Sequence, residues 1–162
     1  MNQSSKKIIS SSNIAKKNDI TNDQANIDPS EKAIKDALAD LKHLKDYSVR
    51  DLVRHSADFG RYLKHQGLET NQMRKFLDAV NRIKAKIIGT ERKEFSSIQD
   101  DVVLLQPKLA YAAGRKDTSR PLKPFSKIII SAIDKVHSLE DFNRLVQLIE
   151  SIIAYHKAEG GK

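Results

Sequence analysis

The chain of 162 residues contains no cysteine, and this absence excludes several kinds of chemistry. Without thiols there is no disulfide framework, no cysteine nucleophile and no cysteine-based zinc or iron–sulfur site. Apolar runs are short, as at residues 128–130 and 152–154, and none approaches the roughly 18–20 residues of a membrane span. The lysines near the N-terminus are not followed by the apolar stretch of a secretory signal. We therefore expect a soluble, cytoplasmic protein with no membrane partner.

Arrangements of catalytic side chains are also missing. The sequence has no glycine-rich phosphate loop and no histidines paired four residues apart. Asp100 and Asp101 are adjacent, which places them about 100° apart around a helix, so they do not form a carboxylate pair. His156 falls on an apolar stripe, where we expect a buried structural histidine. No catalytic residue, metal site or cofactor is predicted, and we expect a protein that is not an enzyme.

The chain is rich in basic residues and poor in aromatic ones. Lysine and arginine number 29 against 21 acidic residues, which gives a net charge of +8 and makes a polyanion the first partner to consider. Aromatic residues make up only 6% of the chain, and most of them fall at expected core positions. This scarcity disfavours a base-stacking platform. Contact with the backbone of a duplex or an ordered strand fits better.

Helix signals dominate from residue 28 onward. Asp28 and Pro29 are typical of a helix start, and Ser48 and Ser138 begin similar capping sequences. Apolar residues then recur at helical spacing, and no convincing strand pattern is present. We expect an all-α fold, a compact bundle of five to six helices with one domain at residues 28–162. Residues 1–27, rich in serine, asparagine and lysine, are expected to form a disordered tail.

A few residues predict where the helices end. The second helix should end near Gly67, and Thr70 should cap the third, which should stop at Gly89 in a left-handed conformation. Pro107 should interrupt the fourth helix, because it supplies no amide hydrogen. Residues 115–121 are expected to form a polar loop before the fifth helix.

Placing residues at 100° steps assigns faces to the helices. Val49, Val53 and Gly60 fall on the core face of the second helix, and Asp141 falls on the wet face of the last. The second and third helices each carry a basic ridge, and we expect the two ridges to lie parallel on neighbouring antiparallel helices. The segment 108–127 is a further basic region. The candidate phosphate-binding residues are Arg50, Arg54, Arg61, Lys75, Arg82, Lys86, Lys108, Arg115 and Lys116.

Three segments of the sequence together resemble a known family. They are residues 68–81 (LETNQMRKFLDAVN), residues 105–115 (LQPKLAYAAGR), and the final helix, which contains Phe142, Leu145 and Glu150 and closes on IAYHK. The combination covers roughly residues 34–160. It resembles the small subunit of type III-A CRISPR–Cas effector complexes, the Csm-type interference complex.

The resemblance implies an all-α antiviral-defence subunit with no catalytic centre of its own. It implies several copies stacked along a filament, lining the groove for target RNA beside the backbone subunits that hold guide RNA. The implied partners are therefore the guide RNA–target RNA duplex, other subunits of the complex and neighbouring copies of the chain itself. Within residues 105–115, we expect Tyr111 to pack with its hydroxyl hydrogen-bonded, and Arg115 to contact phosphate or to cap nearby carbonyls.

Two other functions compete with the RNA-binding subunit. One is a helical DNA-binding regulator that uses the third helix for recognition after a tight turn at residues 67–69. Its basic residues are spread along that helix, however, and do not cluster at the N-terminal end as in a helix-turn-helix protein. The other is a small ribonuclease with His55 or His65 as acid and base, although these residues lack paired geometry. Copurification with guide RNA and partner subunits would distinguish the effector subunit from both.

Overall fold

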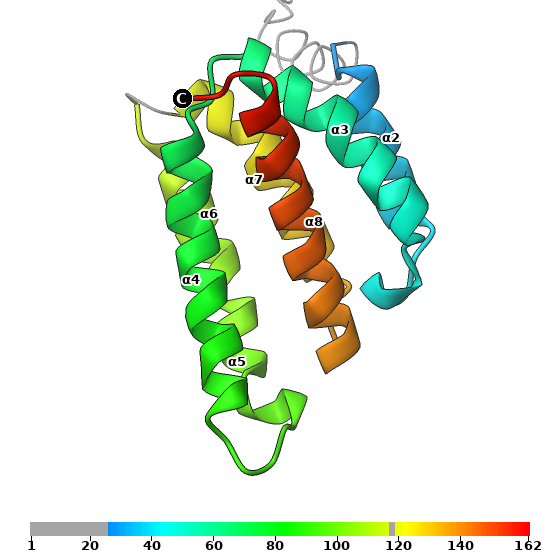
Figure 1. The fold of residues 1–162 in the computed structure, drawn as a ribbon, viewed down its shortest axis with the longest axis vertical. Helices are drawn as coiled ribbons and strands as arrows, with labels where there is room; N and C mark the ends of the chain where they lie inside the picture. Colours follow the sequence, from blue (N-terminus) through cyan, green and yellow to red (C-terminus); the bar gives the residue numbers. More distant parts are fainter. Residues whose placement is uncertain (1–25, 117–118) are drawn as a thin grey trace, which may run out of the picture.

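The computed structural model describes residues 26–116 and 119–162, and within these ranges the regular elements are all helices (Figure 1). In chain order they are α2 (Pro29–Ala39), η2 (Leu44–Asp46), α3 (Val49–His65), α4 (Thr70–Ile88), η3 (Phe95–Ser97), α5 (Gln99–Val103), α6 (Leu105–Gly114), α7 (Ser119–Ile133) and α8 (Leu139–Ala158). Six α-helices of the described part have ten or more residues, so the predicted all-α bundle is confirmed. The predicted tail lies outside the described residues, except for its last two positions.

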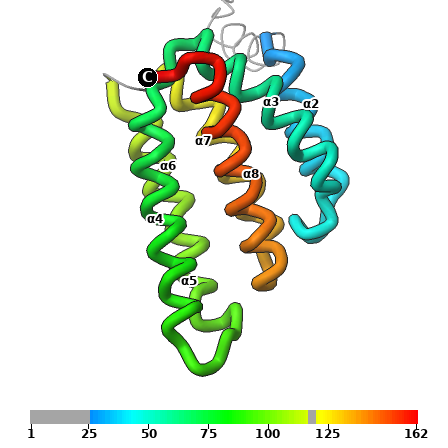
Figure 2. Tube along the Cα trace, viewed as in Figure 1, coloured from blue at the N-terminus to red at the C-terminus, as the bar shows by residue number. Residues whose placement is uncertain are grey.

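Helix α8 is the central element of the bundle. It runs between α3 and α4 and packs on both of them, most extensively on α3 (Figures 1 and 2). Its predicted apolar stripe is buried, and two further apolar side chains outside that stripe, Val146 and Leu148, are buried as well. Because α8 separates α3 from α4, the two helices do not present neighbouring basic ridges, and that prediction is wrong.

Helices α3 and α8 approach each other closely at Gly60. A Cβ atom at this position would lie 2.8 Å from the main-chain nitrogen of His156 and 2.9 Å from the carbonyl oxygen of Ile152. The absence of a side chain therefore allows the close contact of the two helices, and the core position predicted for Gly60 is confirmed. Val49 and Val53, by contrast, are 51% and 37% exposed. Val49 is the first residue of α3, and Val53 lies at the edge of its apolar stripe.

The predicted helix starts are confirmed at three caps. The Asp28 carboxylate accepts the N–H of Ser30 at 2.8 Å, and the Ser138 hydroxyl accepts the N–H of Asp141 at 3.1 Å. Ser48 caps α3 in the same way. These caps are local in sequence, since the side chain and the N–H that it accepts lie two or three residues apart.

Two predictions around α4 are wrong. Its N-cap is Glu69, and Thr70 is the first helical residue. At the other end, Gly89 has a right-handed conformation with φ of −81°. A left-handed residue is not needed there, because the hydroxyl of Thr90 donates to the carbonyl oxygen of Ile87 at 2.9 Å. The positive φ occurs instead at Gly67, with a value of 82°, in the turn between α3 and α4.

Pro107 interrupts its helix as predicted, but the break falls earlier in the chain. Helix α5 ends at Val103 and α6 begins at Leu105, so Pro107 lies in the first turn of α6. A proline at 107 cannot donate to the carbonyl of residue 103, four positions before it, and the helix is broken at that carbonyl. Helix α7 starts at Ser119, inside the predicted loop at 115–121, because the first turn of a helix tolerates Pro121.

Asp141 is fully buried, although the sequence placed it on the wet face of the last helix. The turn at η2 folds back over the start of α8, and the Asp141 carboxylate accepts the N–H of Lys45 at 2.8 Å and that of His137 at 2.9 Å. Burial alone would raise the pKa of Asp141. The N–H donors of Lys45 and His137, together with the nearby His43 ring, hold this pKa below its usual value. Asp141 therefore links η2 to α8.

His156 joins the end of α8 to the turn between α3 and α4. The ring is fully buried, as predicted, with Nε2 2.7 Å from the carbonyl oxygen of Leu68 and Nδ1 3.2 Å from the hydroxyl of Thr70. A neutral ring that carries its proton on Nε2 donates to Leu68 and accepts from Thr70. Burial lowers the pKa of His156, and the positive charges of Lys64 and Lys157 lower it further.

We expect the folded protein to lose stability as the pH falls below about 6.5, the ordinary pKa of an unfolded histidine. The pKa of His156 is lower in the folded state, so the unfolded chain binds a proton first and is favoured by acid. The slope reaches at most about 1.4 kcal/mol per pH unit for one histidine. Urea unfolding at pH 7.5 and 5.5 measures it. His156→Gln should reduce the pH dependence, and His65→Gln, the same substitution at an exposed position, is the matched control.

Candidate nucleic-acid interface

The nine predicted phosphate-binding residues are all exposed, and the structure places eight of them, all but Lys116, in two groups. Three arginines lie on α3, whereas the lysines and arginines of α4 and α6 face one another across the junction of these helices. The second group forms the candidate interface. It contains Lys75, Arg82 and Lys86 on α4 and Lys108 and Arg115 on and just after α6.

We call the hollow between these two helices the α4–α6 groove. One part of it, of about 290 Å³, contains Lys75, Lys108 and Arg115 above an apolar floor. The adjoining part contains Arg82, Lys86 and again Lys108. Ala79 lines both parts, so the cationic surface is continuous along the groove. On α4 the arrangement follows from periodicity, since Lys75 and Arg82 are seven residues apart and share a helix face. Arg115 is the extended residue that directly follows α6.

Most of the groove cations lack an acidic partner. Lys86 pairs with Asp101 at 2.8 Å, with both side chains exposed. Exposed pairs of this kind contribute little free energy, so a phosphate can compete with Asp101 for Lys86. Among the described residues, no carboxylate lies within ion-pair distance of Lys75, Arg82, Lys108 or Arg115. The groove therefore presents positive charge to solvent.

A second cationic hollow lies on the other flank of α6, where α6 packs on α7. We call it the α6–α7 hollow. Exposed Lys123 and Lys127 line it, together with Ala110, Ala113 and Gly114. These two lysines were not among the predicted binding residues. The positive charge of residues 108–127 was visible in the sequence, but the packing of α7 along α6 was not. Lys116, which was predicted, follows α6 and lines neither hollow.

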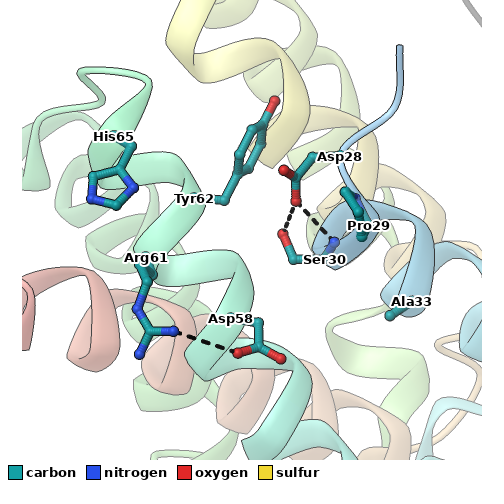
Figure 3. Close-up of a pocket in the computed structure, with 8 residues that line it drawn as sticks. All are labelled: Asp28, Pro29, Ser30, Ala33, Asp58, Arg61, Tyr62 and His65. Atoms are coloured by element: carbon teal, nitrogen blue, oxygen red, sulfur yellow. Dashed lines mark hydrogen bonds and ion pairs between the residues drawn. The ribbon is translucent and has the colours of Figure 1, made fainter. Parts of the chain in front are cut away.

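The arginines of α3 lie on a surface of mixed charge. Arg54 pairs with Asp51 at 2.9 Å, and Arg61 pairs with Glu159 at 3.1 Å. Figure 3 shows Arg61 beside Asp58 in a hollow between α2 and α3, which Asp28 and His65 also line. The carboxylates offset part of the positive charge of this surface, and α8 separates it from α4.

The histidines proposed for a ribonuclease are not paired. Nδ1 of His55 lies 2.8 Å from the hydroxyl of Tyr47 in a half-buried contact. Burial lowers the pKa of His55, and the positive charge of Arg54 lowers it further. His65 is ten residues further along the same helix, which corresponds to about 15 Å. Within the described residues, no group of three or more histidine or acidic side chains is placed to hold a metal ion.

Tyr111 lies at the surface and is not packed as predicted. It is 76% exposed, and its hydroxyl has no hydrogen-bond partner among the described residues. The reason is its angular position. The buried residues of α6 are Leu105, Leu109 and Ala113, and Tyr111 points nearly opposite to them around the helix.

The described residues thus form an all-α protein with a cationic groove between α4 and α6. Within this part of the chain, no helix combines the length and the hydropathy that a membrane span requires. Residues 46–162 match the model of the family described as Csm2 Type III-A. A relative from Streptococcus thermophilus, named CRISPR system Cms protein Csm2, is 28% identical over 103 residues, which cover 64% of this chain and 78% of the relative. No solved structure gives a significant match. The chain belongs to the Csm2 family of type III-A CRISPR systems, which confirms the resemblance found in the sequence.

Proposed function

We propose that this chain is a non-catalytic, RNA-binding subunit that lines the groove for target RNA paired to guide RNA. The Csm2 family supports its role as the small subunit of a type III-A CRISPR complex. The observation that carries the RNA-binding role is the α4–α6 groove, with four cations that no described carboxylate neutralises. In this proposal the protein acts in antiviral defence in the cytoplasm. Its partners are the RNA duplex, other subunits of the complex and neighbouring copies of itself.

The geometry of the groove favours contact with the phosphate backbone. Lys75 and Arg82 are separated by seven helical residues, or about 10.5 Å along α4. Lys108 on α6 and Arg115 just after it line the opposite wall. Cations therefore stand on both walls and can neutralise several phosphates of one strand. Lysine and arginine contacts to phosphate hold the RNA in place but carry no sequence information. A subunit that accepts any guide sequence requires this kind of contact.

The RNA-binding proposal predicts a steep salt dependence without sequence preference. The logarithm of the affinity of the full-length protein for RNA, measured by fluorescence anisotropy, should fall linearly with the logarithm of salt concentration, because phosphates that bind the protein release counterions. RNAs of unrelated sequence should give similar slopes and affinities. The same samples, with or without divalent metal, should leave RNA and DNA uncut. Tight, salt-insensitive binding of one short motif, or cleavage that disappears in His55→Ala or His65→Ala, would contradict the proposal.

Membership of the complex requires a separate experiment. A tagged chain expressed in its native host should copurify with partner subunits and with RNA that contains repeat-derived guide sequences. The competing DNA-binding regulator should copurify with neither. The structure gives that alternative no support, because α8 lies between α3 and α4, whereas a helix-turn-helix protein packs its recognition helix on the preceding one.

A further inference from the structure

Tyr111 lies on the solvent-facing side of α6, between two cationic hollows. It lies three residues after Lys108 and four before Arg115, both of which line the α4–α6 groove. Ala110 and Gly114, on its other side, line the α6–α7 hollow with its two lysines. An RNA strand that passes from one hollow to the other crosses α6 at Tyr111.

The ring of Tyr111 is open to a flat ligand. The side chain is 76% exposed, and it forms no aromatic pair with another described residue. Its neighbours Ala110 and Gly114 are small and exposed, so they do not cover the ring. Every nucleobase has a π-face, and stacking on an aromatic side chain accepts any base.

The charge around Tyr111 favours RNA over a protein partner. The core of a protein interface is depleted of lysine and other charged residues around its aromatic anchors. Tyr111 instead has Lys108 and Arg115 on one flank and Lys123 and Lys127 on the other. These cations suit the phosphates on either side of a stacked base.

We infer that Tyr111 stacks on an unpaired base of the bound RNA, while the cations of the α4–α6 groove and the α6–α7 hollow hold the phosphates on either side. This inference rests on the proposed RNA-binding function and extends it. The faces of bases inside a duplex are covered by their neighbours, so the RNA at α6 must present a base that is flipped out, bulged or single-stranded. Tyr111 thus gives the protein a preference for RNA with an unpaired base over a fully paired duplex, and the lysines and arginines supply most of the affinity.

Three RNAs and three variants, Tyr111→Ala, Tyr111→Phe and Lys108→Ala, test this inference with the full-length protein. The RNAs are a single strand, a fully paired duplex and the same duplex with a one-nucleotide bulge that carries 2-aminopurine. Wild type should bind the single strand and the bulged duplex more tightly than the paired duplex, and should quench 2-aminopurine fluorescence. Tyr111→Ala should weaken binding to those two RNAs by about five- to hundredfold, the effect of losing one stacked base, and abolish the quenching. Binding to the paired duplex and the salt slope should not change, because no charge is removed.

The Tyr111→Phe variant and the results that would contradict the inference are defined as follows. Tyr111→Phe should behave as wild type, since it keeps the ring. Because Tyr111 is exposed, neither variant should alter the thermal midpoint appreciably. If Tyr111→Ala binds all three RNAs as wild type does while Lys108→Ala weakens them, stacking is refuted and RNA binding stands. If Lys108→Ala also has no effect, the proposed function itself fails. Loss of self-association in Tyr111→Ala, with RNA affinity unchanged, would make Tyr111 a protein contact and overturn the inference.

Discussion

Replacing Lys75, Lys108 and Arg115 together with alanine should lower RNA affinity by about ten- to hundredfold at physiological salt. The three side chains line one part of the α4–α6 groove, and no described carboxylate neutralises them. Each phosphate contact that is lost should reduce the slope of log affinity against log salt by up to about one unit. The losses should be similar for RNAs of different sequence, because backbone contacts carry no sequence information. Stability should change little, since the residues are exposed.

Net charge alone could produce a weaker version of this result, so the control variant must remove the same charge elsewhere. Lys32, Lys35 and Lys42 lie on or just after α2, which packs on α3 and α7 and does not border the groove. Their replacement with alanine should leave the salt slope nearly unchanged. Equal weakening by the two triple variants would show a net-charge effect and refute the groove as the site. A third variant, with alanine at Arg50, Arg54 and Arg61, tests the α3 surface by itself.

Local features of the fold could be predicted from the sequence, and features that depend on distant contacts could not. The caps at Asp28, Ser48 and Ser138 involve residues two or three positions apart, and all were predicted. The separation of α3 from α4 depends instead on α8, about eighty residues further along the chain. The burial of Asp141 similarly depends on the N–H of Lys45, 96 residues away. Helical periodicity carries no information about either contact.

The same distinction applies to the candidate site. Periodicity predicted that Lys75 and Arg82 would be exposed, and they are; Lys108, chosen because it lies in the basic segment 108–127, is exposed as well. It could not show that α4 and α6 would bring them to one groove, or that α7 would add Lys123 on the opposite flank of α6. Tyr111 was predicted to pack because tyrosine usually buries its ring, but its angular position places it away from the core.

Ile149→Asp should unfold most of the protein. Ile149 is fully buried, with 0% of its surface accessible to solvent, in the middle of α8. Aspartate at this position would bury an unpaired charge and leave a cavity, which together cost several kcal/mol. Total stabilities of natural domains are only about 5–15 kcal/mol, so a loss of this size removes much of the free energy of unfolding. Circular dichroism should show reduced helicity, and urea unfolding should occur at a much lower concentration.

The control for this variant is Asn143→Asp, which introduces the same charged side chain on an exposed position of α8. It should retain helicity and unfold close to the wild-type urea concentration, because the new carboxylate remains hydrated. Wild-type stability in Ile149→Asp would mean that the buried stripe of α8 is not core and that the arrangement of α3 and α4 around it is incorrect. The two variants also separate folding from binding. Ile149→Asp should lose RNA affinity only together with helicity, whereas the groove variant should lose affinity while its helices remain intact.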